Sequence, residues 1–333
     1  MQNNLNILQP QPVLSICIPT FCRAHNLDKC LAAITIQFDK KPKLISKVEI
    51  IISDNASTDN TRLVVEKYIK KYNNIKYFVN ENNLGADENY INSVINSSGK
   101  FSWIIGDDDF VLGNTLNCLV NFLEKNDVII YTIETETFVN MQTVLQEREC
   151  SNNVEFFSAK SFNDFFERGF CIGLLSSIIF NRKAWLDVDR EEYLPGWSYY
   201  EIALKMIARS TLPLAHIRFP MIATLESCDW VKNGTEFFYF INWKNILERL
   251  PNFGYNVGYV NLCLSKFPKK LIIILLRAKG NGLKTTKNNL FRLCKEFYKS
   301  PFYLVLALII FIIPNFIIKS VRDIRKKIND IKI

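Results

Sequence analysis

The stretch Gly85–Asp109, GADENYINSVINSSGKFSWIIGDDD, holds a helix pattern, a short apolar strand and an acidic turn, in that order. GADENYINSVINSS predicts a helix, and KFSWII predicts a buried strand. A helix that leads directly into a buried strand is typical of a parallel α/β sheet. Ligand-binding residues of such sheets collect at the carboxyl ends of the strands. The three aspartates therefore stand where a functional site is expected.

The same alternation of strands and helices extends over the first 130 residues. Strands are predicted at 13–21 (VLSICIPTF), 47–56 (KVEIIISDNA), 75–80 (IKYFVN), 100–105 (KFSWII) and 127–133 (DVIIYTI), and helices at 26–38, 57–72, 85–98 and 114–126. Strands that alternate with helices form parallel β-α-β units. We therefore predict an α/β fold with a mostly parallel sheet flanked by helices, and an irregular polar loop over 138–160.

Four polar loops follow the predicted strands: PTFCR (19–23), SDNASTD (53–59), NENNLGA (80–86) and GDDD (106–109). We expect them to meet in one crevice that holds several carboxylates and very few cations. Adjacent carboxylates repel each other and lose hydration when buried. A divalent ion such as Mg²⁺ or Mn²⁺, completed by substrate phosphates, would supply the missing positive charge. The alternative is a solvated acidic turn or a helix N-terminus.

Composition excludes several kinds of protein and site. A length of 333 residues with 48% hydrophobic content is enough for one large domain or two small ones. Nine cysteines without a Cys-x-x-Cys pair argue against a disulfide framework and a zinc site, so reduced cytosolic thiols are expected. The two histidines, His25 and His216, are too few for a multi-histidine metal site. Because Gly-x-Gly-x-x-Gly and Walker-type motifs are absent, dinucleotide hydride chemistry and P-loop phosphoryl transfer are disfavoured.

The net charge of +8 comes from the end of the chain. Residues 268–333 carry 15 Lys and Arg against 3 acids, whereas residues 1–267 carry 26 basic and 30 acidic groups. This basic tail contains the apolar blocks 271–276 and 302–318, which favours an anionic membrane surface over nucleic acid as its partner. Basic residues flank block 302–318 on both sides, which favours an in-plane or re-entrant helix over one true span. A buried helix of a soluble fold is the third alternative.

Three stretches carry a resemblance to a known family: SICIPTFCRAHNLDKCLAAITIQ (15–37), VEIIISDNASTDNT (48–61) and NNLGADENYINSVINSSGKFSWIIGDDD (82–109). Together they resemble the nucleotide-sugar domain of family 2 glycosyltransferases, whose fold is called GT-A. LLSSIIFNRKAW (174–185), with the Gly-Asp-Asp-Asp turn, is similar to abequosyltransferase-like enzymes of bacterial O-antigen synthesis.

The resemblance implies that a sugar moves, with inversion, from a nucleotide-diphosphate donor to an acceptor hydroxyl. It implies a GT-A domain over 1–230, with a nucleotide-binding half at 13–135 and an acceptor half at 136–230. Residues 231–333 would form a helical, membrane-associating region. The start of the sequence, MQNNLNILQPQP, lacks a cleavable signal pattern. We therefore expect the protein on the cytoplasmic face of the inner membrane, where the acceptor would be a lipid-linked oligosaccharide of an O-antigen or capsule-type polysaccharide.

The resemblance also implies a set of site residues. Nucleotide-sugar-binding residues are predicted in all four loops: Pro19, Thr20, Phe21, Arg23, Asp54, Asn55, Asn83, Gly85, Asp107 and Asp108. Asp108 and Asp109 are the predicted ligands of Mg²⁺ or Mn²⁺. Family members commonly have Asp-x-Asp-Asp here, and in that register Gly106 takes the place of the first aspartate.

The catalytic base is expected at the helix predicted from SYYEIALKMIA (198–208), where the family often has a Glu-Asp pair that this chain lacks. Glu201 is the nearest carboxylate, and its alternative role is that of an ordinary exposed helix residue. Further carboxylates precede the helix: Asp187, Asp189, Glu191 and Glu192. Because the pair is missing, a catalytically inactive nucleotide-sugar-binding scaffold is one alternative function. The other is a sugar nucleotidyltransferase, which would need a basic phosphate-binding loop near the start of the chain. Arg23 and Lys29 would supply only two cations for such a loop.

Overall fold

The computed structural model describes residues 11–151, 153–159, 174–225, 234 and 236–321. The chain divides into two compact units between Glu226 and Ser227. The predicted boundary lay at residue 230. The finer division of the first domain into halves at 135 stays a prediction.

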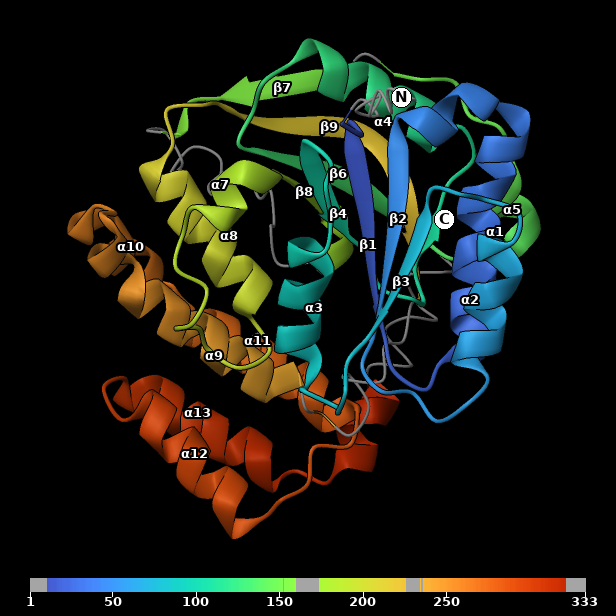
Figure 1. The fold of residues 1–333 in the computed structure, drawn as a ribbon. Coiled ribbons are helices and arrows are strands. Elements are labelled where there is room, and N and C mark those ends of the chain that lie inside the picture. Colours follow the sequence, from blue (N-terminus) through green and yellow to red (C-terminus); the bar gives the residue numbers. More distant parts are fainter. Residues whose placement is uncertain (1–10, 152, 160–173, 226–233, 235, 322–333) are drawn as a thin grey trace, which may run out of the picture. The chain divides into compact units, whose positions relative to one another are not determined.

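The first unit contains the α/β sheet and the helices around it (Figure 1). Its strands are β1 (Leu14–Thr20), β2 (Val48–Asp54), β3 (Ile75–Val79), β4 (Phe101–Ile104), β5 (Phe110–Val111), β6 (Ile130–Thr137), β7 (Val154–Phe157), β8 (Ile178–Asn181) and β9 (Leu214–Thr224). Its helices are α1 (Ala24–Lys40), α2 (Thr61–Ile69), α3 (Ala86–Ile95), α4 (Thr115–Lys125), α5 (Met141–Leu145), α7 (Arg182–Leu186) and α8 (Ser198–Arg209). Every strand and helix predicted before residue 138 is present.

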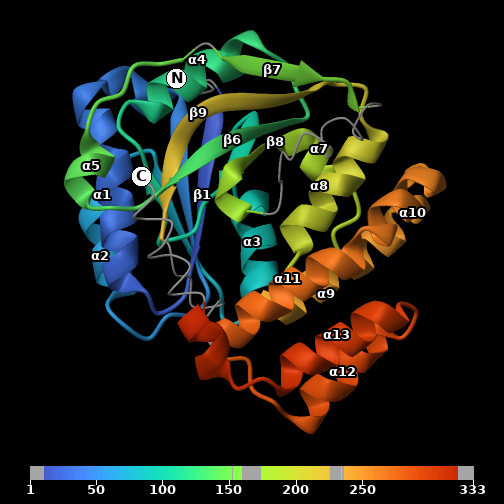
Figure 2. The same ribbon diagram turned by 180° about the vertical axis from the view of Figure 1, so that it is seen from behind.

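The sheet has the strand order β3-β2-β1-β4-β8-β6-β9-β5, and β7 pairs with β9. The first four strands are parallel, as predicted. From β8 onward the sheet is mixed, because β8 runs antiparallel to both β4 and β6, while β6 and β9 are parallel. Helices α1 and α2 cover one side of the parallel strands and α3 covers the other (Figures 1 and 2). The predicted α/β fold with flanking helices is confirmed.

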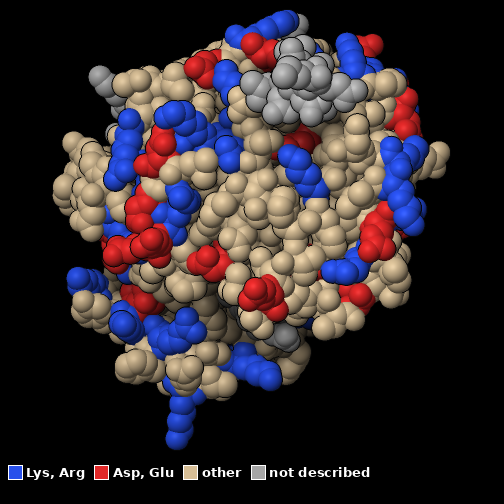
Figure 3. Space-filling model, in the orientation of Figure 1, with Lys and Arg blue, Asp and Glu red and all other residues tan. Residues whose placement is uncertain are grey.

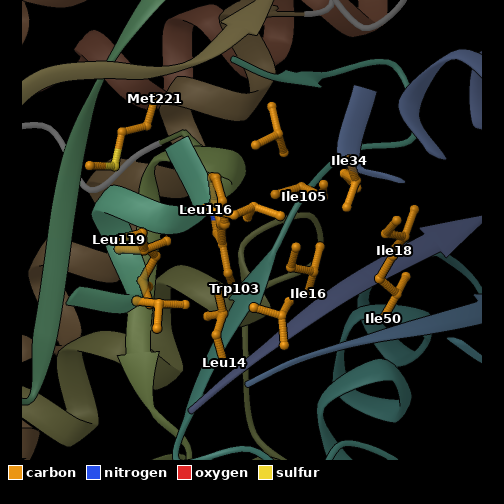
Figure 4. Close-up of a cluster of buried hydrophobic side chains, with 14 of the residues drawn as sticks. Leu14, Ile16, Ile18, Ile34, Ile50, Trp103, Ile105, Leu116, Leu119 and Met221 are labelled. Carbon is orange, nitrogen blue, oxygen red and sulfur yellow. The ribbon is translucent and has the colours of Figure 1, made fainter. Parts of the chain in front are cut away.

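The main core is formed by side chains of the parallel strands and of α1, α2 and α4 (Figure 4). β1 and β2 are buried along their whole length, which explains why their sequences are continuous apolar runs instead of alternating ones. Leu27, Leu31 and Ile34 of α1 are fully buried. Trp103 of β4 is also fully buried, and its indole N–H donates to Ser176 O at 2.8 Å.

Two predictions about the middle of the chain were wrong. The segment 138–160 is not wholly irregular, because it contributes α5 and the strand β7. Cys118 and Cys150 form a disulfide with their Cα atoms 5.5 Å apart, so not every thiol is free. The fold places a residue of α4 beside one that lies 32 positions later, a proximity that cysteine spacing alone does not reveal.

The second unit is helical in its described part. It consists of α9 (Glu236–Arg249), α10 (Val257–Ser265), α11 (Phe267–Gly280), α12 (Lys287–Phe297) and α13 (Pro301–Ile312). The apolar block 302–318 is not one element, because α13 ends at Ile312. Within the described residues, no single helix is both long and apolar enough to cross a bilayer. Taken together, α13 and Asn315–Val321, bent by 99°, meet that requirement by length and composition.

Candidate active site

The four polar loops meet at the carboxyl edge of the parallel strands. β1 lies between β2 and β4, with Thr20 in register with Asp54 and Cys17 with Ile104. Backbone hydrogen bonds continue past the strand ends, from Asn55 N to Thr20 O at 3.0 Å and from Ile105 N to Cys17 O at 3.0 Å. The loops are therefore fixed side by side, as the sequence predicts.

Arg23 supplies positive charge to the aspartate turn. Its Nε lies 3.2 Å from Asp107 Oδ1, and its Nη2 lies 2.6 Å from Asp108 Oδ2. Thr20 Oγ1 donates to Asp107 Oδ2 at 2.7 Å. Arg23, one of the few cations expected in the crevice, therefore pairs directly with the turn, although it lies some 85 residues earlier in the chain.

Burial raises the pKa of two of the three aspartates in the turn. Asp107 is 3% exposed, and burial raises the pKa of its carboxyl to about 6, against the opposing effects of Arg23 and Thr20. Burial raises the pKa of Asp109 to about 7, although its carboxylate accepts a hydrogen bond from Ser176. Asp108 is more exposed, with a side-chain exposure of 22%. Asp107 already has Arg23 beside it, whereas a further cation would help Asp109 to hold its charge.

Gly106 leaves room for two carboxylates to converge. A Cβ at this position would lie 2.8 Å from Asp108 Oδ1 and 3.1 Å from Asp109 Oδ2. A side chain at this position would therefore displace one or both of these carboxylate oxygens. Two converging carboxylate oxygens are suitable ligands for a hard divalent ion that substrate phosphates and water complete. The described residues contain no group of three or more His, Cys, Asp or Glu side chains placed to hold a metal.

Ser176 is a site residue that the sequence prediction missed. It lies in a short 3-10 turn, Leu175–Ser177, just before β8. Its Oγ donates to Asp109 and accepts from Gly106 N at 2.9 Å. Ser176 therefore fixes both ends of the aspartate turn. The available signal was its place within LLSSIIFNRKAW (174–185), the stretch that is similar to abequosyltransferase-like enzymes.

Asp54 is buried and closes its own loop. Its Oδ1 accepts from Ser57 N at 2.9 Å, and its Oδ2 accepts from the Tyr77 hydroxyl at 2.5 Å. Asp54 is therefore hydrogen-bonded within its own loop and to Tyr77 of β3. Its predicted contact with a nucleotide sugar stays a prediction.

Asn55 ties the second loop to the third. Its Nδ2 donates to Asn83 Oδ1 at 2.7 Å and to Gly85 O at 3.1 Å, and its Oδ1 accepts from Leu84 N at 2.9 Å. Gly85 has a φ of 87°, a backbone conformation that L side chains rarely adopt. Asn55, Asn83 and Gly85 thus shape the edge of the crevice.

The predicted residues of the first loop lie at the same edge. Pro19 is buried at the end of β1, and Phe21 is 42% exposed. Cys22 follows with a φ of 51°, and its N–H donates to Ser57 Oγ at 2.8 Å. Pro19, Thr20, Phe21 and Arg23 are thus brought to the aspartate edge, although their contacts with a donor stay predictions.

Glu201 is fully buried in α8, so it is not an ordinary exposed helix residue. Its Oε2 accepts from Leu194 N at 3.0 Å, in the loop before the helix. Asp87 at the start of α3 binds the same loop, accepting from Gly196 N at 2.6 Å and Ser198 N at 3.1 Å. The sequence prediction missed Asp87, although it follows directly on the NENNLGA loop.

The four further carboxylates lie outside this arrangement. Asp187 pairs with Lys183 at 2.7 Å, and Asp189 pairs with the buried Lys205 at 2.9 Å. Glu191 and Glu192 are exposed. Glu201 thus shares the loop 193–198 with Asp87, and its role as base stays a prediction.

Sequence comparison identifies the family. The profile described as "Glycosyl transferase family 2" matches residues 15–184, just over half of the chain. The chain belongs to glycosyl transferase family 2. The matched region contains all four loops, the aspartate turn and Ser176, and it ends before Glu201.

Characterised relatives match parts of this family 2 chain. Abequosyltransferase RfbV of Salmonella typhimurium is 30% identical over 210 residues, which are 60% of this chain and 62% of the relative. A second relative, from Campylobacter jejuni, is named GalNAc(5)-diNAcBac-PP-undecaprenol beta-1,3-glucosyltransferase. It is 37% identical over 110 residues, which are 33% of this chain and 34% of that protein. The similarity thus covers less than two thirds of either relative.

Solved structures share the GT-A fold. Staphylococcus aureus TarS 1–349 in complex with UDP-GlcNAc superposes with a TM-score of 0.59 at 13% identity, covering 88% of this chain and 90% of TarS 1–349. The mannosyltransferase PcManGT of Pyrobaculum calidifontis, in complex with GDP-Man and Mn²⁺, gives a TM-score of 0.52 at 14% identity, covering 90% and 86%. At these identities the likeness establishes the fold alone.

Proposed function

We propose that this protein transfers a sugar from a nucleotide-diphosphate donor to a hydroxyl group of a saccharide acceptor, with inversion at the anomeric carbon. The observation that carries the proposal is the cluster of Arg23, Thr20 and the three aspartates at the carboxyl edge of a family 2 fold. The UDP-GlcNAc and GDP-Man complexes of TarS and PcManGT support a nucleotide sugar as donor.

Arg23 and the aspartates would bind the diphosphate part of the donor. Asp108 and Asp109 would hold Mg²⁺ or Mn²⁺, as their convergent oxygens suggest, and PcManGT contains Mn²⁺. The ion, when bound, neutralises charge that develops on the departing diphosphate. Thr20 and Ser176 keep Asp107 and Asp109 in place, and Arg23 adds a second positive charge.

Glu201 is the proposed base. As the acceptor oxygen bonds to the anomeric carbon, the bond from that carbon to the diphosphate breaks and the hydroxyl proton passes to the carboxylate. Attack opposite to the leaving group inverts the configuration. Complete burial of Glu201 favours the second candidate, a scaffold that binds donor without transfer. Family membership argues against a sugar nucleotidyltransferase.

The acceptor is proposed to be a lipid-linked oligosaccharide of an O-antigen or capsule-type polysaccharide. Two relatives support it, since one is named an abequosyltransferase and the other is named for a substrate on undecaprenyl diphosphate. Synthesis on such a carrier would place this protein at the cytoplasmic face of the inner membrane.

A thermal-shift screen tests donor binding. A ligand that binds only the native state at 100 times its Kd stabilises it by about 2.7 kcal/mol, or a few degrees in Tm. We expect one nucleotide sugar in a panel to raise Tm by this amount with Mn²⁺ present, and clearly less without it. A panel that leaves Tm unchanged would argue against both candidate functions.

A further inference from the structure

We propose that α12 and α13 form a docking surface for an anionic lipid bilayer and lie in the plane of its interface. The inference concerns where the protein binds, so it does not depend on the proposed reaction. Its basis is the distribution of exposed apolar and basic side chains on these two helices.

α13 has two apolar faces, and only one of them is buried. Ala307, Ile310 and Phe311 lie on the inner face, with exposures of 4% or less. The opposite face carries Phe302, Val305, Ile309 and Ile312, which are 74%, 58%, 54% and 73% exposed. Spacings of three and four residues place these four side chains in one stripe along the helix. No charged residue interrupts it, because α13 contains none.

The outer face of α12 combines aromatic and basic side chains. Leu293 and Phe297 are buried on its inner face. Phe291 of α12 and Tyr298, which follows its last residue, are 70% and 63% exposed. The exposed basic residues beside them are Lys287, Lys295, Lys299 and Arg292, whose guanidinium also stacks on the Phe238 ring. Aromatic rings prefer the headgroup level of a bilayer, and lysine reaches from that level to the lipid phosphates. Figure 3 shows blue and tan surface over these helices.

The positive charge around α12 and α13 favours an anionic bilayer over a second copy of this chain as the binding partner. From Lys284 to Lys319, inclusive, the sequence has six basic residues and one acid, Glu296. Glu296 is already paired with Lys244 at 3.2 Å. A second copy of this chain would bring the same cations together, which is unfavourable, whereas acidic headgroups neutralise them. The apolar stripe and the basic face therefore fit an amphipathic interfacial surface.

Vesicle co-sedimentation of the full chain tests this surface. We expect binding to vesicles of phosphatidylglycerol and phosphatidylethanolamine, weaker binding in high salt, and little binding to pure phosphatidylcholine. Phe302→Ser/Ile309→Ser should weaken binding at least tenfold, since it removes two side chains of the stripe. Lys295→Gln/Lys299→Gln should weaken it about 30-fold, because each surface cation contributes about 1 kcal/mol.

Matched controls lie in the first unit. Leu63→Ser changes a side chain of α2 that is 65% exposed, and Lys43→Gln/Lys70→Gln removes two exposed cations. Both controls should bind vesicles like the wild type. All variants change exposed positions, and unchanged Tm values will show that they fold.

Three results would overturn the proposal. They are equal binding to neutral and anionic vesicles, equal losses in the control variants, or a dimer in light scattering that Phe302→Ser/Ile309→Ser dissociates while vesicle binding is unchanged. The last result would assign the stripe to a second copy of the chain.

Discussion

At the scale of single residues, Arg23 changes the interpretation of the aspartate turn. The sequence predicted a carboxylate cluster, its place in the fold and Arg23 as a site residue, but not the direct pairing of Arg23 with the aspartates. Pairing of Arg23 with Asp107 and Asp108 depends on how the loop after β1 closes over the loop after β4. Ser176 was missed for the same reason, since its contact with Asp109 spans 67 positions. The local sequence pattern predicts which residues belong to the site, whereas contacts between residues far apart in the sequence follow only from the tertiary structure.

Arg23→Ala should weaken nucleoside diphosphate binding by about 10- to 100-fold, as expected for loss of a charge-assisted hydrogen bond of roughly 1.5–3 kcal/mol. The affinity of Arg23→Lys for nucleoside diphosphate should lie between those of Arg23→Ala and the wild type, since lysine keeps the charge but loses the guanidinium geometry. Isothermal titration calorimetry measures both. Lys43→Ala, which removes an exposed cation outside the four loops, is the matched control. Wild-type affinity in Arg23→Ala would remove Arg23 from the donor site.

At the scale of secondary structure elements, the sequence predicted β1 to β4, β6 and the helices α1 to α4, but not the short strand β5. The predicted elements are locally encoded, because the strands are rich in apolar residues and each helix has an apolar face. β7 and α5 were missed since 138–160 is polar, and β7 is held as a strand by pairing with β9. Likewise, burial of Glu201 depends on the packing of α8 and on the loop that precedes it.

A buried carboxylate joins the amino ends of β1, β2 and β4. Glu49 of β2 accepts hydrogen bonds from Ser15 Oγ at 2.6 Å, Lys76 Nζ at 2.8 Å and Ser98 N at 2.5 Å. Burial raises the pKa of Glu49, but these hydrogen bonds more than offset that effect and hold it below its usual value. Its contribution to stability is therefore complete above pH 4.5 and is lost as pH falls further.

Glu49→Gln should reduce the free energy of unfolding at pH 7 by about 2–3 kcal/mol. The side-chain N–H group of Gln would face the groups that now donate hydrogen bonds to Glu49, so at least one of these bonds would be lost. Urea unfolding at pH 7 and pH 4 measures the effect, and the difference from wild type should shrink at the lower pH. Glu66→Gln, at an exposed position of α2, is the control. A wild-type unfolding curve for Glu49→Gln at pH 7 would contradict this role.

At the scale of the whole molecule, charge and hydropathy separate two parts that differ in composition and in fold. The first is acidic overall and forms the α/β unit, and the second is basic, apolar and helical. Composition predicted this contrast. It did not predict that the block 302–318 breaks after Ile312, because block length alone says nothing of the bend at 313–314.

The most direct test of the proposed function is release of nucleoside diphosphate from the donor that stabilises the protein most, with the diamagnetic ion Mg²⁺ present. Phosphorus NMR follows the diphosphate, and proton NMR reports the configuration of the freed or transferred sugar. We expect turnover with inversion, and loss of about 100-fold or more in Asp108→Asn, in line with removal of a transition-state electrostatic contact. Asp127→Asn, which alters a surface pair with Lys100, should keep wild-type turnover. Turnover that is absent, or equal in wild type and Asp108→Asn, would contradict a glycosyltransferase site at the aspartate turn.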